Sequence, residues 1–365
     1  MKLFLYECKK MIGCRKMLLL IMLLLLVDFG KITIYLHYNP VVQVSLEKKK
    51  DTAIWEYEKQ FEGEITEEKA KKIVKGYKSC QRFMQGTGKY NETDEFCFQT
   101  YPLYRYQYTY HMMMEDRLKE AAENIKFYQS HNNFYQAELN RLIFKIYSNR
   151  VIDDYYNSED FYYLFEYQFS TFLLLIFALV LSFQFFYVEK ENGTYQMLIS
   201  LGRNKNKVFV NKYSNLFFGI LLVGIVLYLQ DVILFGKMLN LRGWWNPVYA
   251  IQSYRDSIFH VTILEYYLLN CGMRIGSAFL FALLCVFVEQ WFSGKFLPVV
   301  ASGFIAVFLI LTGDHYLNLD QYGMKLQVIS VGNHPCLVIW VWLAVFMSML
   351  VIFSILIHRS FRICN

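Results

Sequence analysis

The chain has 365 residues, of which 55% are hydrophobic and 18% aromatic, and its mean hydropathy is +0.24. This composition excludes an ordinary soluble domain and predicts an integral membrane protein. The formal net charge of +6 does not indicate nucleic-acid binding, because the Lys and Arg residues gather beside apolar runs and form no separate basic domain with interleaved aromatic residues.

Six segments are long and apolar enough to cross the hydrocarbon core of a membrane, which takes about twenty residues of α-helix. They are residues 17–36, 167–188, 213–235, 266–287, 296–311 and 337–357, and the fifth of them is short. The sequence therefore predicts an all-α polytopic membrane protein with six transmembrane helices.

Residues 1–16 precede the first span and predict an amphipathic helix. Its apolar face consists of Phe4, Leu5, Cys8, Met11 and Ile12, and charged residues cover much of the remainder. Such a helix would lie in the cytoplasmic membrane interface; the alternative is a frayed, positively charged tail. The apolar run that follows could also be the core of a cleaved signal peptide, although no small-residue cleavage pattern comes after it.

The short loops with many basic residues all fall on one side of the membrane. These residues are Lys2, Lys9, Lys10, Arg15, Lys16, Lys190, Arg203, Lys205, Lys207, Lys212, Lys295, Arg359 and Arg362. The loops of the other side, 236–265 and 312–336, carry fewer basic residues over a greater length. Because short cytoplasmic loops are enriched in Lys and Arg, we predict that both termini, including a tail at 358–365, are cytoplasmic.

Residues 37–166 lie between the first two spans and are polar and tyrosine-rich, so this orientation predicts a mostly helical extracellular domain. Charged amphipathic patterns predict long helices over 51–78 and 114–151. The loop between them is flanked by Cys80 and Cys97, which predict either a disulfide that closes the loop or two free thiols. The eight cysteines form no CxxC pair and have no histidine at ligand spacing, so no metal site is indicated.

A strongly polar island, residues 189–212, separates the second and third spans. Glu189 and Glu191 suit the N-terminus of a helix, where carboxylates interact favourably with unpaired amides. Gly193 permits a sharp change of direction and Thr194 can cap a short helix over 195–201, whose apolar face holds Met197, Leu198 and Leu201. The structural alternative is a membrane-surface hairpin whose charges only set the topology.

This island resembles the cytoplasmic loop of the ABC type-2 permeases, the membrane subunits of exporters for drugs, peptides, lipids and polysaccharides. The resemblance lies in Glu189, Glu191, Gly193, Thr194, Leu198, Arg203 and Lys212, which follow the pattern E-x-E-x-G-T, then a short apolar helix, then arginine and a later lysine. An N-terminal elbow helix, six spans with both termini inside and, in one branch, a large external insertion after the first span also belong to that family.

The resemblance implies a multi-pass protein of the bacterial plasma membrane whose helix at 195–201 couples it to separate ATPase subunits. ATP and Mg²⁺ would be bound by those partners, because this chain has no GxxxxGK[ST] motif and no cofactor site of its own. A second permease subunit, identical or different, would complete a dimer around the transport path.

Asp28 and Arg274 are charged residues inside the first and the fourth predicted span. Asp28 and Arg274 fall at nearly the same depth at about 1.5 Å per residue, so we predict that they pair within or between subunits, or that Arg274 contacts an anionic part of a substrate. The alternative is that both side chains extend outward to the membrane surface. Gly272 and Gly276 flank Arg274 as a small-xxx-small step that would let another helix approach closely.

Two other classes of protein compete with a permease. A membrane-embedded enzyme is disfavoured, because the sequence has no HExxH or GxSxG motif and the spans suggest no paired acidic or histidine cluster that could activate water or hold a metal. No catalytic residue is therefore predicted. A membrane-anchored sensor or scaffold, with an extracellular helical domain that binds a partner, remains the alternative function.

Overall fold

The computed structural model describes residues 15–39, 42–43, 59–64, 66–84, 116–148, 150, 154–155, 158–184, 205–239, 241–291, 300, 303, 326–332 and 334–363. The predicted elbow helix (up to residue 14), the coupling segment 189–204 and the tail from residue 364 onward lie outside these residues. So does the predicted fifth span, 296–311, apart from residues 300 and 303. These predictions are therefore untested by the described structure.

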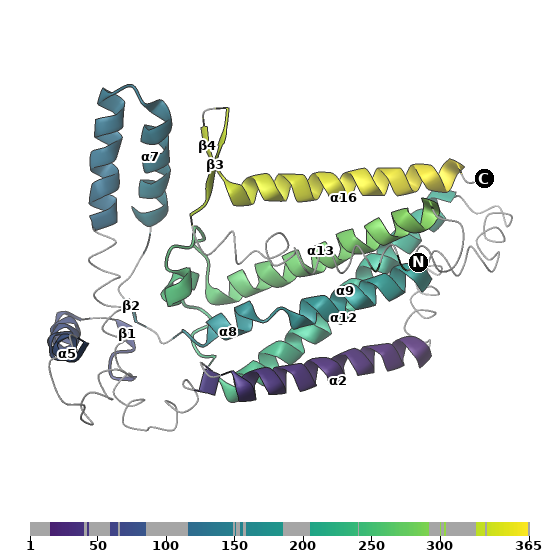
Figure 1. Ribbon diagram of the computed structural model, residues 1–365, viewed down its shortest axis with the longest axis horizontal. Helices are drawn as coiled ribbons and strands as arrows, with labels where there is room; N and C mark the ends of the chain where they lie inside the picture. Colours follow the sequence, from purple (N-terminus) through teal and green to yellow (C-terminus); the bar gives the residue numbers. More distant parts are fainter. Residues whose placement is uncertain are drawn as a thin grey trace.

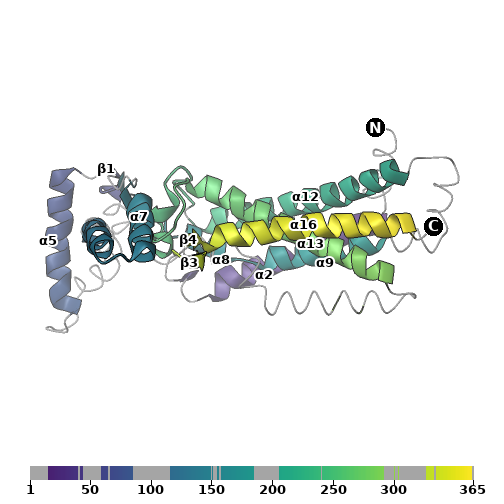
Figure 2. The ribbon, with the colours of Figure 1, turned by 90° about the horizontal axis from the view of Figure 1, so that it is seen from above.

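The described chain is mostly helical and contains five spans that are long and apolar enough to cross a membrane. Their helices are α2 (Arg15–Tyr38), α8 (Phe161–Glu166) with α9 (Phe169–Ser182), α12 (Lys205–Met238), α13 (Ile263–Trp291) and α16 (Val338–Ile363). They coincide with five of the six predicted spans and lie side by side as one bundle (Figure 1, Figure 2).

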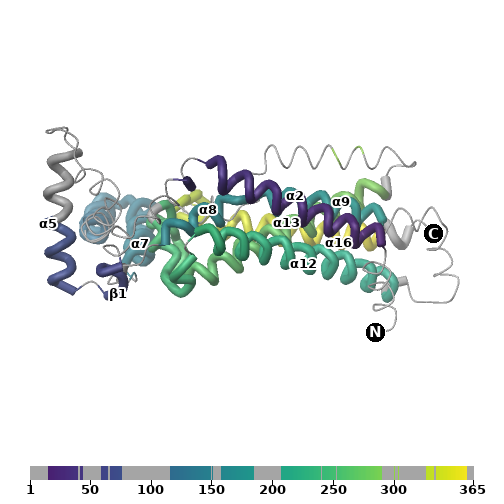
Figure 3. The backbone as a smooth tube through the Cα atoms, turned by 90° about the horizontal axis from the view of Figure 1, so that it is seen from below, coloured from purple at the N-terminus to yellow at the C-terminus, as the bar shows by residue number. Residues whose placement is uncertain are grey.

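Helix α9 lies at the centre of the bundle and packs against α12, α13 and α2. Helix α2 runs along α12 on one side (Figure 3), and α16 packs on α13 on the other. The two outer helices expose rows of large apolar side chains, among them Leu19, Leu26, Met347 and Ile352. Apolar surface of this extent is typical of a protein that contacts lipid or another membrane subunit.

Close helix contacts occur at two glycines. A Cβ added to Gly224 of α12 would lie 2.8 Å from the side chain of Ile275 in α13, so only glycine fits there without rearrangement. Gly276 faces Phe346 of α16 at 3.2 Å, whereas nothing lies within 4 Å of a Cβ at Gly272. The predicted small-xxx-small step therefore contributes one close contact rather than two.

Two predicted boundaries of the membrane helices are wrong. The second span begins at Phe161, not at 167, and its helix is interrupted at Tyr167 and Gln168. The polar island was predicted to reach Lys212, but α12 already begins at Lys205. The side chain of Lys212 is almost fully buried within this helix. Neither Gly nor Pro interrupts 205–212, and Val208 and Phe209 are buried, so the helix continues through the basic residues.

The helices of the region between the first two spans also differ in part from the prediction. Instead of one helix over 114–151, a helix at 116–130 and α7 (Phe134–Ser148) form an antiparallel helical hairpin. Asn132 adopts a positive φ of 56°, and the Asn133 side chain accepts a hydrogen bond from the Gln136 amide at 3.2 Å, so a left-handed residue and an N-cap replace the helix interior. Helix α5 begins at Glu67, later than the predicted start at residue 51, and it ends at Met84.

Two small antiparallel sheets depart from the all-α prediction. Strand β1 (Gly63–Glu64) pairs with β2 (Asp154–Tyr155), and β3 (Val328–Val331) pairs with β4 (His334–Leu337) through a turn in which Gly332 has a φ of 56°. Strand β4 contacts α7 and leads directly into α16. The hairpin of helices thus stands against one end of the membrane bundle (Figure 1), which we call the hairpin end.

The connector between α12 and α13 is held by local hydrogen bonds. It contains the short 3-10 helices η2 (Val248–Ala250) and η3 (Gln252–Tyr254). At its end, Thr262 and Glu265 form a reciprocal capping box: the Thr262 amide donates to the Glu265 carboxylate at 2.8 Å and the Glu265 amide donates to the Thr262 hydroxyl at 3.2 Å. This cap explains why α13 begins at Ile263.

Candidate functional site: a polar layer inside the helix bundle

A layer of polar side chains crosses the interior of the bundle. Its members come from α2, the α8–α9 interruption, α9, α12 and α13, and they are Asp28, Tyr167, Ser170, Asp231 and Arg274, which we call the polar layer. Asp28 and Ser170 are completely buried, and Asp231 and Arg274 are 2% and 4% exposed. Charged side chains at this depth in a membrane are rare and need partners, so such a layer marks a structural or functional centre.

Asp28 is held by donors from two other parts of the chain. The Tyr167 hydroxyl donates to its Oδ1 at 2.9 Å, and the Ser170 hydroxyl lies 3.2 Å from the same oxygen. Gln230 Nε2 lies 3.3 Å from the other carboxyl oxygen and also donates to the Leu25 carbonyl at 2.9 Å. These contacts join α2 to α9 and α12 through a single carboxyl group.

Asp231 shares the Ser170 hydroxyl with Asp28. The Ser170 oxygen lies 2.8 and 2.7 Å from the two carboxyl oxygens of Asp231, so one hydroxyl hydrogen stands between two carboxyl groups. Two carboxylates in a site from which water is excluded repel each other strongly. The positive charge of Arg274 in the same layer offsets part of this repulsion.

Arg274 closes the gap between α8 and α9. Its two terminal nitrogens donate to the backbone carbonyls of Tyr167 at 2.9 Å and Phe165 at 2.8 Å. These carbonyls lie at the end of α8, where a helix leaves its last carbonyl groups without helical partners. A cation at a helix C-terminus also interacts favourably with the helix dipole. Arg274 therefore satisfies backbone groups that could not remain unpaired inside a membrane.

Aromatic rings fix the position of Tyr167, which contacts both charged partners. Its ring centroid lies 5.8 Å from that of Tyr35 and 5.4 Å from that of Phe235. On the other side of the layer, the Tyr267 hydroxyl donates to the Tyr228 carbonyl at 2.9 Å and so connects α13 to α12. In the described part of the chain, packed aromatic rings therefore surround the layer on both sides.

The structure places Asp28 and Arg274 in the same layer, as their depths predicted. Asp28 lies ten residues before the end of α2 and Arg274 eleven residues after the start of α13, which puts both about 15 Å from the hairpin end. Both side chains are buried, so neither extends to the membrane surface. Tyr167 links them, through its hydroxyl to Asp28 and its carbonyl to Arg274, and a direct pair or a contact with substrate stays a prediction.

The sequence suggested no paired acidic cluster in the spans that could activate water or hold a metal, yet two buried carboxyl groups share one donor in the bundle. Asp231 lies within the predicted third span and meets Asp28, a residue some two hundred positions earlier, through Ser170. The presence of a carboxylate in each of two spans was the available sequence signal, but which helices are neighbours is not visible in the sequence. Within the described part of the chain, no group of three or more His, Cys, Asp or Glu side chains could hold a metal ion.

The other predicted site residues have different outcomes. Glu189, Glu191, Gly193, Thr194, Leu198 and Arg203 lie outside the described residues, and Lys212 lies inside α12. Cys80 lies in α5 and Cys97 lies outside the described residues, so the disulfide stays a prediction.

Comparison of the chain with models of protein families, with curated proteins and with solved structures finds no match. The resemblance to type-2 permeases therefore depends on the residues of the island and on the arrangement of the spans alone.

Proposed function

We propose that this chain is the membrane-spanning permease subunit of an ABC exporter of the type-2 family, driven by separate ATPase subunits. The observation that carries the proposal is the E-x-E-x-G-T island between α9 and α12, the position that a coupling helix occupies in that family. ATP and Mg²⁺ belong to the partner, and a second permease subunit completes the transport path. The cargo is a peptide, drug or lipid-like molecule.

The course of the described helices supports a cytoplasmic position for the island. Helices α2 and α12 begin, and α9, α13 and α16 end, at the end of the bundle opposite the hairpin end (Figure 1). Arg15 and Lys16 of α2, Lys207 of α12 and Arg359 of α16 all belong to this basic end. By the positive-inside rule, a concentration of basic residues near the ends of spans favours the cytoplasm of a bacterial cell.

A sixth crossing is supported by the connectivity of the chain. Helix α13 ends at the basic end with Trp291, whereas β3 begins at the hairpin end with Val328. These two ends lie on opposite sides of the bundle, and the sequence between them contains the apolar segment 296–311 that was predicted as the fifth span. Six crossings with both termini on one side are the plan of the proposed family.

The polar layer supplies a physical route from the island to the other helices. Helix α12 follows the island directly and carries Asp231 into the layer, where Ser170 joins it to α2 and α9. A displacement of α12 by an ATPase subunit would therefore act on three helices at once. The exposed apolar faces of α2 and α16 offer surfaces for a second subunit or for lipid.

Purification of the full chain from its native membrane tests the proposal. We expect an ATPase subunit to purify with it, and Leu198→Ala or Gly193→Leu to uncouple ATP hydrolysis from transport without removing the chain from the membrane. Ile199→Ala is the matched control, because this residue lies on the opposite face of the predicted 195–201 helix.

Two results would contradict the proposed function. One is labelling of a cysteine at position 198 by an impermeant reagent from outside the cell, and the other is the absence of any nucleotide-hydrolysing partner. Unchanged activity of the Leu198 and Gly193 variants would instead favour the membrane-anchored sensor.

A further inference from the structure

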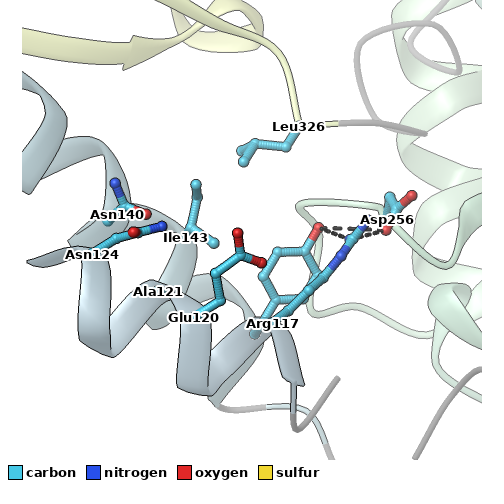
Figure 4. A pocket seen from close by; sticks show the side chains of 9 residues that line it. Arg117, Glu120, Ala121, Asn124, Asn140, Ile143, Asp256 and Leu326 are labelled. Atoms are coloured by element: carbon cyan, nitrogen blue, oxygen red, sulfur yellow. Dashed lines mark hydrogen bonds and ion pairs between the residues drawn. The ribbon is translucent and has the colours of Figure 1, made fainter. Parts of the chain in front are cut away.

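A cavity of about 340 Å³ lies where the external helices meet the hairpin end of the bundle, away from the polar layer. Its walls come from the helix at 116–130, from α7, from the α12–α13 connector through Asp256 and from the chain before β3 through Leu326 (Figure 4). The volume lies at the lower end of the range for small-ligand sites, about 300–1,000 Å³. Four separate chain segments therefore line a half-open pocket of the size that a short ligand fills.

The charges in this cavity favour a cation. Arg117 is neutralised by Asp256, whose carboxylate lies 2.5 Å from its guanidinium, and it also donates to the Tyr147 hydroxyl at 3.1 Å. Figure 4 shows the Glu120 carboxylate between this ion pair and the two asparagines. Among the described residues no hydrogen bond or ion pair engages Glu120. One negative charge is thus left to attract a ligand.

The wall opposite the ion pair presents amides and apolar groups. Asn124 and Asn140 lie side by side there, and Ile143 and Leu326 face the space beside them (Figure 4). Asn140 is 7% exposed, and its amide nitrogen donates to the Gln136 carbonyl at 2.8 Å, which leaves its side-chain oxygen to accept another hydrogen bond. Adjacent side-chain amides match the donor and acceptor of a peptide bond.

We propose that this cavity binds a short peptide segment that presents a lysine. The lysine ammonium pairs with Glu120, the neighbouring peptide bond contacts Asn124 and Asn140, and the aliphatic part of the lysine packs on Ile143 and Leu326. An anionic ligand would meet the remaining negative charge of Glu120 and is disfavoured. A bound peptide would also hold the external hairpin against the connector that leads into α13, because Asp256 and the hairpin residues line the same space.

The test uses the full chain in lipid nanodiscs and three fluorescent tripeptide amides. Each peptide has leucine at both ends, and the central residue is lysine, norleucine or glutamate. We expect the lysine peptide to bind at least about fivefold more tightly than the norleucine peptide at low salt, and the difference to shrink as salt is added. No ATPase subunit is present, so the outcome is independent of the proposed transport function.

Glu120→Gln should abolish the preference for lysine over norleucine, whereas Glu123→Gln, an exposed residue on the same helix outside the cavity, should retain it. Both positions are exposed, so the thermal unfolding midpoint should stay unchanged and the comparison should report binding alone. Equal binding of the lysine and norleucine peptides, tighter binding of the glutamate peptide, no binding at millimolar concentrations, or equal effects of the two substitutions would each overturn the proposal.

Discussion

Replacement of Arg274 by methionine is the most direct perturbation of the polar layer. Methionine fills a similar volume without donors or charge, so the variant removes two hydrogen bonds, to the carbonyls of Phe165 and Tyr167, and leaves two acidic side chains without their buried cation. The carbonyls would remain buried beside a helix interruption, where no water replaces the lost donor.

The expected cost follows from these contacts. Hydrogen bonds from a charged donor contribute about 1.5–3 kcal/mol each, which gives about 3–6 kcal/mol for the pair. This agrees with the roughly 3–5 kcal/mol that the loss of one partner from a buried charged set usually costs. We therefore expect the free energy of unfolding to fall by about 4 kcal/mol and the unfolding midpoint in detergent to fall by about 5–15 °C. Arg141→Met, at an exposed position on α7, is the control and should change stability by less than about 0.5 kcal/mol.

A second substitution distinguishes the charge of Arg274 from its hydrogen bonds. Asp231→Asn removes one negative charge while it keeps a group that can bond Ser170, so the cost of Arg274→Met should be about 1–2 kcal/mol smaller in the Asp231→Asn background. If Arg274→Met were no more harmful than Arg141→Met, or if Asp231→Asn left its cost unchanged, the account of Arg274 as the cation that offsets two buried carboxylates would be refuted.

Three further predictions concern helix packing and the external junction. Gly224→Ala should lower the free energy of unfolding by about 1–3 kcal/mol through its clash with α13, whereas Gly272→Ala, with open space around it, should be neutral or slightly stabilising. Arg150 donates to the carbonyls of Arg255 and Ser257, so Arg150→Lys should speed hydrogen exchange across α7. Burial and the positive charge of Arg150 hold the pKa of His260 below its usual 6.5, against a hydrogen bond that the ring donates to the backbone carbonyl of Ile146. A neutral His260 therefore stabilises the fold above about pH 6.5 and loses this contribution as the pH falls; NMR titration should give a midpoint below 6.5.

The spans were predictable because their signal is local. About twenty apolar residues in sequence suffice to identify a crossing helix, and five predicted spans coincide with observed ones. Two of the errors also had local signals. Asn132 and Asn133 favour a left-handed residue and an N-cap within the supposed 114–151 helix, and the Gly-Asn pair after Val331 is a hairpin signal inside a segment predicted as a loop.

The polar layer could not be predicted because its contacts are not local. The interruption at Tyr167 has no Gly or Pro, and it depends on a guanidinium that comes more than one hundred residues later. Asp231 becomes part of the site because the Ser170 hydroxyl contacts both its carboxyl group and that of Asp28. In both cases the polar residues are visible in the sequence. Which of them contact one another depends on how four separate segments pack together.

Helix α12 connects the island, the polar layer and the connector that lines the cavity. With 34 residues it extends about 50 Å, from the basic end that follows the island to the connector that carries Asp256. Along this length it meets α13 at Gly224 and the polar layer at Asp231, and it then leads to the wall of the external cavity. Because a packed helix moves largely as a rigid body, displacement of its basic end and occupancy of the cavity at the hairpin end would act on the same element. The two sites are therefore coupled through α12 if the island is a coupling segment, and peptide binding should then alter the rate of ATP hydrolysis by the partner subunit.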